Sequence, residues 1–220
     1  MGKATKQAVM FDLDGTLLDT IEDLADSMNA VLAKEGLPTE PVEKHKFMVG
    51  DGVRSYVLRA LPADRRDDAT LVERISQKYR AKYAASWHRK TKPYEGICEM
   101  LSALVAKGLR LTVLSNKPDD FSRQMVGHFL GQFNFDVVRG ALETMPLKPD
   151  PSAAREIAGQ MGVAPADFLY LGDTATDMKT AQSAGMFAVG ALWGFRPREE
   201  LQQAGAQALI EHPLDLLKLL

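Results

Sequence analysis

Two aspartates directly follow a short apolar run near the start of the sequence, which reads AVMFDLDGT over residues 8–16. An apolar run that ends in a turn signal is typical of a short buried strand, here residues 8–11. Asp12 and Asp14 therefore stand at the carboxyl end of a predicted strand. Crowded carboxylates favour protonation of one of them unless a cation lies nearby. We expect both a bound metal and a division of work between a nucleophile and an acid/base group.

Further polar side chains stand at the ends of other predicted strands or in the adjoining loops. The predicted strands 109–114 and 168–171 end in such residues, and the loop before a helix predicted from Pro151 carries a lysine. Functional groups of open parallel sheets gather beyond the carboxyl ends of the strands, so we expect a single site. Besides the two leading aspartates, its predicted members are Ser115, Asn116, Lys148, Asp173 and Asp177.

The predicted site carries a strong negative excess, because it combines four carboxylates with one lysine. A hard divalent cation would offset this excess, and Mg²⁺ prefers oxygen ligands and keeps water molecules beside one or two carboxylates. Asp12 and Asp173 are the natural direct ligands. Ser115, Lys148 and backbone N–H groups after the first strand could also hold a dianion, and phosphate suits such a nest.

The elements that must position these residues alternate between helix and strand from residue 93 onward. Strands are predicted at 109–114, 135–138, 168–171, 187–191 and 208–210. This alternation predicts βαβ units and a parallel sheet that is covered by helices on both faces. Residues 20–90 show helical patterns and no convincing strand. We therefore predict an α/β core domain of residues 1–19 and 91–220, with a helical domain inserted over 20–90.

Composition excludes several classes of function. The 220 residues include 27 basic and 29 acidic side chains, so no broad basic field favours nucleic acid. Cys98 is the single cysteine, which excludes an intrachain disulfide or a cysteine zinc cluster and favours a reducing cytoplasm. No stretch approaches the roughly 18 apolar residues of a membrane span, and the segment before Asp12 does not resemble a signal peptide. We expect a cytoplasmic protein without nucleic-acid or membrane partners.

The order of the motifs resembles that of the haloacid dehalogenase (HAD) superfamily of phosphohydrolases, over essentially the whole chain. The motifs that carry the resemblance are DLDGT at 12–16, Ser115, Lys148 and GDTATD at 172–177. The resemblance implies a Rossmann-like parallel sheet, the HAD fold, with a small all-helical cap domain inserted after the first strand. Within the family, phosphoglycolate phosphatases are most similar in the segments 17–20, 49–52, 115–118, 148–151 and 193–196.

The resemblance implies a catalytic role for four residues. Asp12 would attack phosphorus and form an aspartyl-phosphate. Asp14 would protonate the leaving oxygen and later deprotonate the hydrolytic water. Ser115 would hold a phosphoryl oxygen, and Lys148 would offset the charge of nucleophile and phosphate. Since phosphate monoesters hydrolyse very slowly unaided, positioning and electrostatics would supply most of the acceleration.

The resemblance also implies a Mg²⁺ site and a set of substrate contacts. Asp12 and Asp173 would bind the metal together with the backbone carbonyl of Asp14, and Asp177 would support it directly or through water. The candidate substrate contacts are Gly15, Thr16, Asn116, Gly50, Asp51, Gly52 and Arg54. The last four stand where the family places a substrate-sensing loop in the cap, and the arginine could pair bidentately with a substrate carboxylate.

A Mg²⁺-dependent phosphatase of small phosphorylated metabolites is the leading hypothesis, with 2-phosphoglycolate as the first substrate and a monomer or homodimer as the assembly. A sugar phosphomutase of the β-phosphoglucomutase type would use the same two aspartates, but Thr16 stands where that group typically has valine. A phosphonoacetaldehyde hydrolase would need a cap lysine for a Schiff base, for which Lys44 or Lys46 could serve. A pyrophosphate hydrolase or a non-catalytic phosphate-binding module on the same fold completes the alternatives.

Three features near these motifs have no predicted chemistry. Lys44, His45 and Lys46 form a small basic cluster, which we interpret as a solvated helix face. Trp193 is interpreted as a packing residue near the domain junction, and Lys117 stands beside the predicted site without an assigned role.

Overall fold

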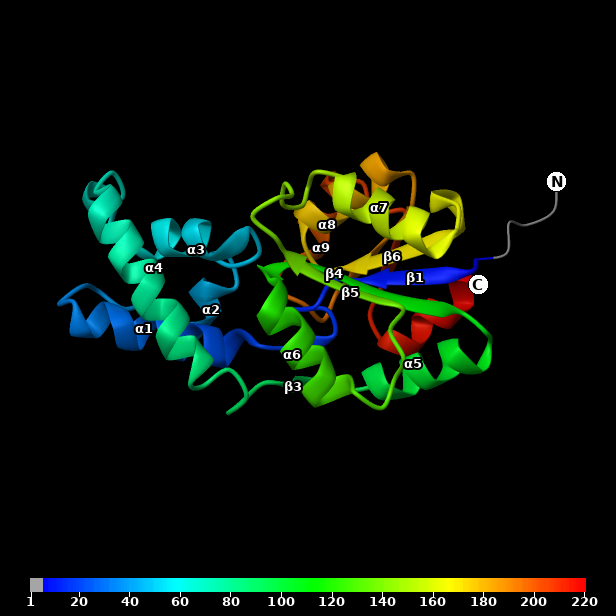
Figure 1. Ribbon diagram of the computed structural model, residues 1–220, viewed down its shortest axis with the longest axis horizontal. Coiled ribbons are helices and arrows are strands. Elements are labelled where there is room, and N and C mark those ends of the chain that lie inside the picture. The colour runs from blue at the N-terminus through cyan, green and yellow to red at the C-terminus, as the bar shows by residue number, and fades with distance from the viewer. Residues whose placement is uncertain (1–5) are drawn as a thin grey trace. The chain divides into compact units, whose positions relative to one another are not determined.

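The computed structural model describes residues 6–220 and divides into two compact units (Figure 1). One unit contains the chain up to Leu18 and from Pro93 to Leu220, and the other contains Asp19–Lys92. The chain therefore changes unit after residue 18 and after residue 92, where the sequence predicts changes after 19 and 90. The short strands β2 (Leu18–Asp19) and β3 (Lys92–Pro93) contain these two crossing points.

The larger unit is built on a parallel sheet, which has six strands in the described part of the chain. Its strands, in spatial order, are β5 (Val137–Ala141), β4 (Arg110–Pro118), β1 (Ala8–Phe11), β6 (Phe168–Gly172), β7 (Phe187–Ala191) and β8 (Ala208–Ile210). The central strand β1 pairs with β4 and β6, so that Phe11 lies beside Val113 and Leu171. The carboxyl ends of three strands that are distant in sequence thus meet at one edge, and the predicted α/β fold class is confirmed.

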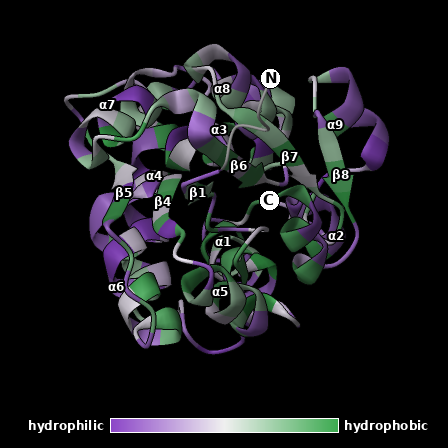
Figure 2. Cartoon of the chain, turned by 90° about the vertical axis from the view of Figure 1, so that its right-hand side faces the viewer, coloured by the Kyte–Doolittle hydropathy of each residue, from purple (hydrophilic) through white to green (hydrophobic). Residues whose placement is uncertain are grey.

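Helices cover both faces of this sheet (Figure 1). One face carries α7 (Ser152–Met161), α8 (Ala175–Ala184) and α9 (Arg198–Gln203), and the other carries α5 (Ile97–Ala106), α6 (Asp119–Leu130) and the 3₁₀-helix η3 (Pro213–Leu219). A further 3₁₀ turn, η2 (Pro165–Asp167), precedes β6. Figure 2 shows that the strands β7 and β8 are largely hydrophobic, whereas α6 and α9 carry hydrophilic stretches. Burial of strand side chains under amphipathic helices holds this unit together.

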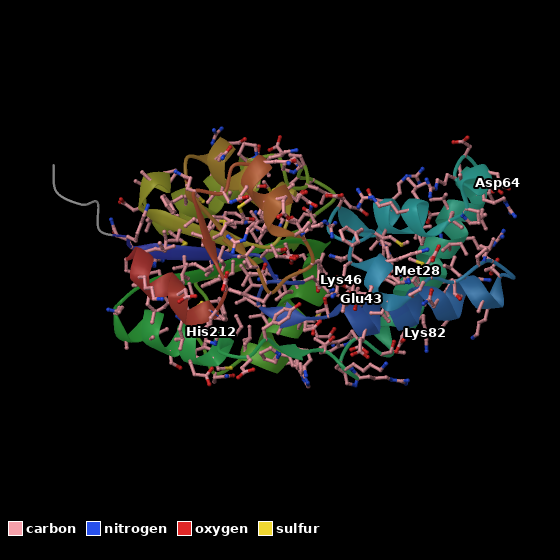
Figure 3. All side chains as sticks on the ribbon, turned by 180° about the vertical axis from the view of Figure 1, so that it is seen from behind. Met28, Glu43, Lys46, Asp64, Lys82 and His212 are labelled. Atoms are coloured by element: carbon pink, nitrogen blue, oxygen red, sulfur yellow. The ribbon has the colours of Figure 1, made fainter. Side chains whose placement is uncertain are left out.

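The smaller unit is helical, as its apolar spacing predicts. It contains α1 (Ile21–Lys34), α2 (Val42–His45), α3 (Gly52–Ala60), the 3₁₀ turn η1 (Ala63–Arg65) and α4 (Ala69–Ala84). Helices α1 and α3 both pack on α4, and Met28 and Ile75 are fully buried there. Figure 3 labels Met28 within this unit, Asp64 and Lys82 on its outside, and Glu43 with Lys46, whose side chains form an ion pair of 2.8 Å.

Two details differ from the expected secondary structure. The predicted closing helix is the 3₁₀-helix η3, whose N-cap His212 (labelled in Figure 3) forms a capping box with Asp215. Tight i→i+3 turns of this kind are common in short terminal pieces. Strand β4 extends to Pro118, four residues beyond the predicted end at 114. Within the described part of the chain, every helix is too short or too polar to serve as a membrane span.

Candidate active site

The turn after β1 places Asp12 and Asp14 at the carboxyl edge of the sheet. Within the turn, the Leu13 carbonyl accepts hydrogen bonds from two later N–H groups at 3.0 Å, and Gly15 N–H donates to the Leu18 carbonyl at 2.9 Å. Gly15 has a φ of +85°, and a Cβ atom there would lie 2.3 Å from Asp173 Oδ2. Glycine is therefore required at this position, because other residues disfavour this backbone and the space is filled.

Lys148 is buried between two of the predicted site aspartates. Its Nζ lies 2.8 Å from Asp12 Oδ1 as an ion pair and donates hydrogen bonds to Asp177 Oδ1 at 2.7 Å and to the Leu114 carbonyl at 3.0 Å. Burial disfavours the charged ammonium, but the two carboxylates outweigh it and raise the pKa of Lys148 well above its usual value. Lys148 is therefore a fixed positive charge in the site.

Asn116 holds the backbone of Lys148 from the neighbouring strand end. Its side-chain amide donates to the Lys148 carbonyl at 3.0 Å and accepts from the Lys148 N–H at 2.8 Å. Asn116 thus acts like a peptide group that joins the loop to β4, and its predicted substrate contact stays a prediction. Ser115, buried beside it, accepts a hydrogen bond from the Lys117 N–H at 3.2 Å.

Asp173 and Asp177 are both fully buried, and protein donors orient both of them. Asp173 accepts from the Thr16 hydroxyl at 2.9 Å and from the Phe195 N–H at 2.8 Å. Asp177 forms a capping box at the start of α8 and accepts from the Thr174 hydroxyl at 2.7 Å. These bonds fix the direction of each carboxylate before any ligand binds. Thr16, predicted as a substrate contact, uses its hydroxyl to orient Asp173.

Asp12, Asp173 and Asp177 each offer an oxygen atom, and these atoms lie within 4.8 Å of one another. Burial and the nearby Asp177 carboxylate raise the pKa of Asp12 to about 7, although Lys148 opposes the shift. Burial, Asp12 and Asp177 likewise raise the pKa of Asp173 well above its usual range. Asp12 Oδ1 is also buried without a hydrogen bond of normal geometry in the described chain. This crowded, hard oxygen donor set fits a divalent cation.

Asp14 differs from the other acids because its carboxylate has a lysine of its own. Both of its oxygens accept hydrogen bonds from Lys117 Nζ at 3.0 Å. Its side chain lies outside the group formed by Asp12, Asp173 and Asp177, so only its predicted backbone contact to metal stays open as a prediction. Sequence analysis assigned Lys117 no role. The available signal was its position directly after Ser115 and Asn116 at a strand end.

The segment that follows β7 closes around the turn after β1. Trp193 Nε1 donates to the Thr16 carbonyl at 3.0 Å. A Cβ atom on Gly194 would lie 2.2 Å from Asp173 Cβ and 2.5 Å from the Gly15 carbonyl, so only glycine fits there. Trp193 was expected to be a packing residue. The structure also gives it a hydrogen bond that braces the turn.

Tyr170 is a second residue that sequence analysis missed. It lies fully buried on β6 and donates its hydroxyl to Asp177 Oδ1 at 3.4 Å. Burial raises the pKa of Tyr170 well above its usual value, so the phenol remains a donor. A tyrosine inside an apolar strand pattern gives no signal of this contact, because tyrosine is also common in strands for packing alone.

The four candidate residues of the helical unit lie on and just after the loop before α3. Gly50 and Gly52 have φ values of +114° and +84°. The Asp51 carboxylate forms an ion pair with Arg59, which also donates to the Met48 carbonyl at 3.0 Å. The side chain of Asp51 therefore organises its own loop. The exposed Arg54 and its three neighbours stay predicted substrate contacts.

The basic cluster at 44–46 is not a uniformly solvated face, because His45 is fully buried. Its Nδ1 lies 2.7 Å from the Tyr56 hydroxyl, and its Nε2 lies 3.2 Å from the Glu40 carbonyl and 3.3 Å from Asn29 Oδ1. Burial lowers the pKa of His45. The sequence did not predict this buried position, because a lone histidine between two lysines is typical of a polar surface.

Comparison with known proteins agrees with the geometry. The family profile described as haloacid dehalogenase-like hydrolase matches residues 9–191. The chain belongs to this family. The hydrolase is 36% identical over 212 residues to phosphoglycolate phosphatase from Rhodospirillum rubrum, which covers 93% of this chain and 87% of the relative. It is 29% identical over 221 residues to N-acetylmuramic acid 6-phosphate phosphatase from Pseudomonas aeruginosa, which covers 100% and 97%.

Solved structures support the same assignment of the hydrolase. The crystal structure of a candidate phosphoglycolate phosphatase from Lactobacillus delbrueckii subsp. bulgaricus superposes with a TM-score of 0.91 at 28% identity, and covers 98% of both chains. The predicted family, fold and enzyme class are thereby confirmed. The roles of the individual site residues stay predictions.

Proposed function

We propose that this hydrolase is a Mg²⁺-dependent phosphatase that acts on small phosphate monoesters in the cytoplasm, with 2-phosphoglycolate as its preferred substrate. The observation that carries this proposal is the gathering of Asp12, Asp173 and Asp177 close to one another, with a buried lysine that pairs with Asp12 and Asp177. Three acids with one cation suit a site whose charge is completed by ligands. A purely structural cluster would gain no stability from such an excess of negative charge.

In the first half-reaction, an Asp12 carboxylate oxygen attacks phosphorus and the bond from phosphorus to the leaving oxygen breaks. The Asp14 carboxyl group transfers its proton to that oxygen, so that an alcohol departs. The products are the alcohol and an aspartyl-phosphate. Lys148, 2.8 Å from Asp12 Oδ1, holds the nucleophile and offsets the charge of the phosphoryl group.

In the second half-reaction, a water molecule attacks the phosphorus of the aspartyl-phosphate and gives its proton to the Asp14 carboxylate. The bond between phosphorus and the Asp12 oxygen breaks, which releases inorganic phosphate and restores both aspartates. Asp12 and Asp173 would hold Mg²⁺, and Asp177 would support them. When bound, the cation supplies charge stabilisation to the phosphoryl oxygens. Ser115 would hold one phosphoryl oxygen through its hydroxyl.

The choice of 2-phosphoglycolate follows relatives that carry this activity in their names, among them the Rhodospirillum rubrum enzyme. The Pseudomonas aeruginosa relative is named for a sugar phosphate and matches the full length of the chain. N-acetylmuramic acid 6-phosphate is therefore the second substrate to test. The two compounds share a phosphate monoester and a carboxylate, and they differ in the size of the leaving group.

The test is phosphate release with and without Mg²⁺ across both compounds, sugar phosphates, nucleotides and pyrophosphate. We expect the highest kcat/KM with 2-phosphoglycolate, and loss of turnover after chelation of divalent cations. Asp12→Asn removes the nucleophile, and we expect it to reduce kcat at least about 10⁴-fold. The matched control is Asp64→Asn, which changes an exposed acid of the helical unit. Equal rates for wild type and Asp12→Asn would exclude the aspartyl-phosphate route.

A further inference from the structure

The two lysines of the site contact different acids. Lys148 contacts Asp12 and Asp177, whereas Lys117 contacts Asp14 through both of its carboxylate oxygens. The Lys117 side chain is 4% exposed, so its ammonium has left bulk water to make this pair. A buried ammonium is costly unless it is paired. The pair is therefore a built feature of the site, and it joins residues 103 positions apart in the sequence.

The backbone of Lys117 is anchored independently of Asp14. Its N–H donates to the Ser115 hydroxyl at 3.2 Å, and its carbonyl accepts from the Ser122 hydroxyl at 3.2 Å. A Cβ atom on Gly140 of the adjacent strand β5 would lie 2.6 Å from that same carbonyl. The lysine thus extends from a fixed point on the sheet edge, and it can define where the Asp14 carboxylate lies.

Lys117 holds Asp14 through both carboxylate oxygens, whereas Asp173 and Asp177 have backbone N–H and hydroxyl donors, to which Asp177 adds a contact with Lys148. Asp173 is oriented by the Phe195 N–H and the Thr16 hydroxyl, and Asp177 by the N–H and hydroxyl of Thr174. The backbone N–H groups among these donors fix one direction. An ammonium on a four-carbon chain offers three rotatable donors, so it can follow a carboxylate through a small movement.

We propose that Lys117 is the positioning residue for the acid/base carboxyl group of Asp14. This inference rests on the proposed function, in which Asp14 serves first the leaving oxygen and then the hydrolytic water. These two oxygens occupy different places, so the carboxyl group must be steered and must still move. A lysine partner meets both requirements. Lys117 acts through Asp14, whereas the proposed nucleophile Asp12 is paired with Lys148.

The test uses the dependence of the first half-reaction on the leaving group. An alkyl leaving group, as in 2-phosphoglycolate, needs the proton of Asp14, whereas p-nitrophenolate leaves without one. Rapid mixing of excess enzyme with each substrate measures transfer of one phosphoryl group to Asp12. For Lys117→Met we expect the rate constant of phosphoryl transfer from 2-phosphoglycolate to fall about 10²-fold. The rate constant of p-nitrophenol release should change little. A loss that arose only from altered folding would slow both substrates equally.

Three companion variants sharpen the result. Lys117→Arg keeps a bidentate donor, and we expect it to restore most of the rate with 2-phosphoglycolate. Asp14→Asn should show the same dependence on the leaving group, and adding Lys117→Met to it should cause no further loss. Lys218→Met, which removes an exposed lysine paired with Asp215, is the matched control and should leave both rates unchanged.

The outcomes separate this inference from the function on which it rests. A wild-type protein that transfers phosphoryl groups from neither substrate would overturn the proposed function itself. An active wild type, combined with equal losses for both substrates in Lys117→Met, would overturn the positioning role alone. Losses from Lys117→Met and Asp14→Asn that simply multiply in the double variant would overturn it as well.

Discussion

Two regions of the molecule bury polar side chains, and they do so in opposite ways. The acid–lysine cluster (Asp12, Lys148, Asp173 and Asp177) brings three carboxylates together and pairs two of them, Asp12 and Asp177, with one ammonium. The histidine cluster of the helical unit (Asn29, Glu40, His45 and Tyr56) pairs both nitrogens of a buried imidazole with neighbouring groups. The acid–lysine cluster therefore carries uncompensated negative charge, and the histidine cluster carries none.

This difference separates a binding site from architecture. A fully satisfied polar network rigidifies a core and has nothing to offer a ligand. A cluster with surplus charge is unfavourable alone and gains stability only when a ligand completes it. Burial, together with the neighbouring Asp177 carboxylate, raises the pKa of Asp12 to about 7, whereas burial lowers the pKa of His45 although Glu40 opposes that shift.

Removing the lysine of the acid–lysine cluster should have the largest effect. Lys148→Met leaves buried carboxylates without their partner, which costs about 3–5 kcal/mol of unfolding free energy when a buried pair is broken. Activity should fall by at least about 10³-fold because Asp12, the proposed nucleophile, loses its charge partner. Urea unfolding and phosphate release measure the two effects. Lys179→Met, an exposed change on α8, should alter neither beyond about 0.5 kcal/mol.

The next largest difference between the two regions should be the response of their stability to divalent cations. In the cation-free protein the pKa of Asp12 is raised to about 7, so the folded state holds a proton that the unfolded chain releases near pH 4. The contribution of Asp12 to unfolding free energy is therefore present below about pH 4 and is lost as pH rises through about 7, by up to about 4 kcal/mol. Subtracting the pH dependence of unfolding free energy of Asp12→Asn from that of the wild type isolates this contribution. Saturating Mg²⁺ should flatten the resulting curve. An unchanged slope of the curve in Mg²⁺ would contradict cation binding at this cluster.

The histidine cluster should respond to the loss of a single hydroxyl. Tyr56→Phe leaves His45 Nδ1 buried without its hydrogen-bond partner, and we expect a loss of about 1–3 kcal/mol in unfolding free energy. Mg²⁺ should not restore this loss, because no cation site is involved. Tyr94→Phe, which changes a tyrosine of the α/β unit, is the matched control. If Mg²⁺ restored the unfolding free energy of Tyr56→Phe, the two regions would not differ in their response to cations.

The pH dependence of the histidine cluster should have the opposite sign to that of Asp12. Burial lowers the pKa of His45 in the folded state, so the unfolded chain takes up a proton first as pH falls. The stabilising contribution is present above about pH 6.5 and is lost as pH falls through the folded-state pKa. Comparing wild type with His45→Gln by urea unfolding between pH 5 and 8 isolates this contribution. A flat difference would show that the imidazole is not held neutral.

Exposed ion pairs should give the smallest effect. Lys218 is 78% exposed and pairs with Asp215 at 2.6 Å. Solvent screening and side-chain entropy leave such pairs about 0–1 kcal/mol, so Lys218→Met should change the melting temperature by a few degrees at most. A larger change would show that a short ion pair stabilises this protein strongly even when it is exposed to solvent.

The sequence predicted the architecture of the α/β unit well, because apolar runs and turn signals locate parallel strands and their ends. Once the sheet was inferred, the gathering of Asp12, Lys148 and Asp173 followed from the rule that strand ends share one edge. The family resemblance supplied roles that spacing alone could not. These predictions depended on backbone topology, which periodicity reports directly.

Contacts that depend on side-chain direction could not be predicted. Lys117, which contacts Asp14, lies where β4 continues past 114 with a register irregularity before Pro118. The burial of His45 depends on how α2 packs, and its charged neighbours hide that position. Gly194 is required by atoms 2.2–2.5 Å from a would-be Cβ, a crowding that no local pattern encodes. Each of these facts appears only when distant segments are brought together.

The pair of hydrogen bonds between the Asn116 amide and the backbone of Lys148 has a consequence for how this protein can evolve. The loop from 142 to 147 that leads to Lys148 has no regular structure apart from turns, and loops of this kind accept insertions and sequence change. Because Asn116 clamps the end of that loop to the sheet, its length can drift while the ammonium stays in register with Asp12. One side-chain amide thus insulates the candidate active site from the most variable kind of segment in the fold.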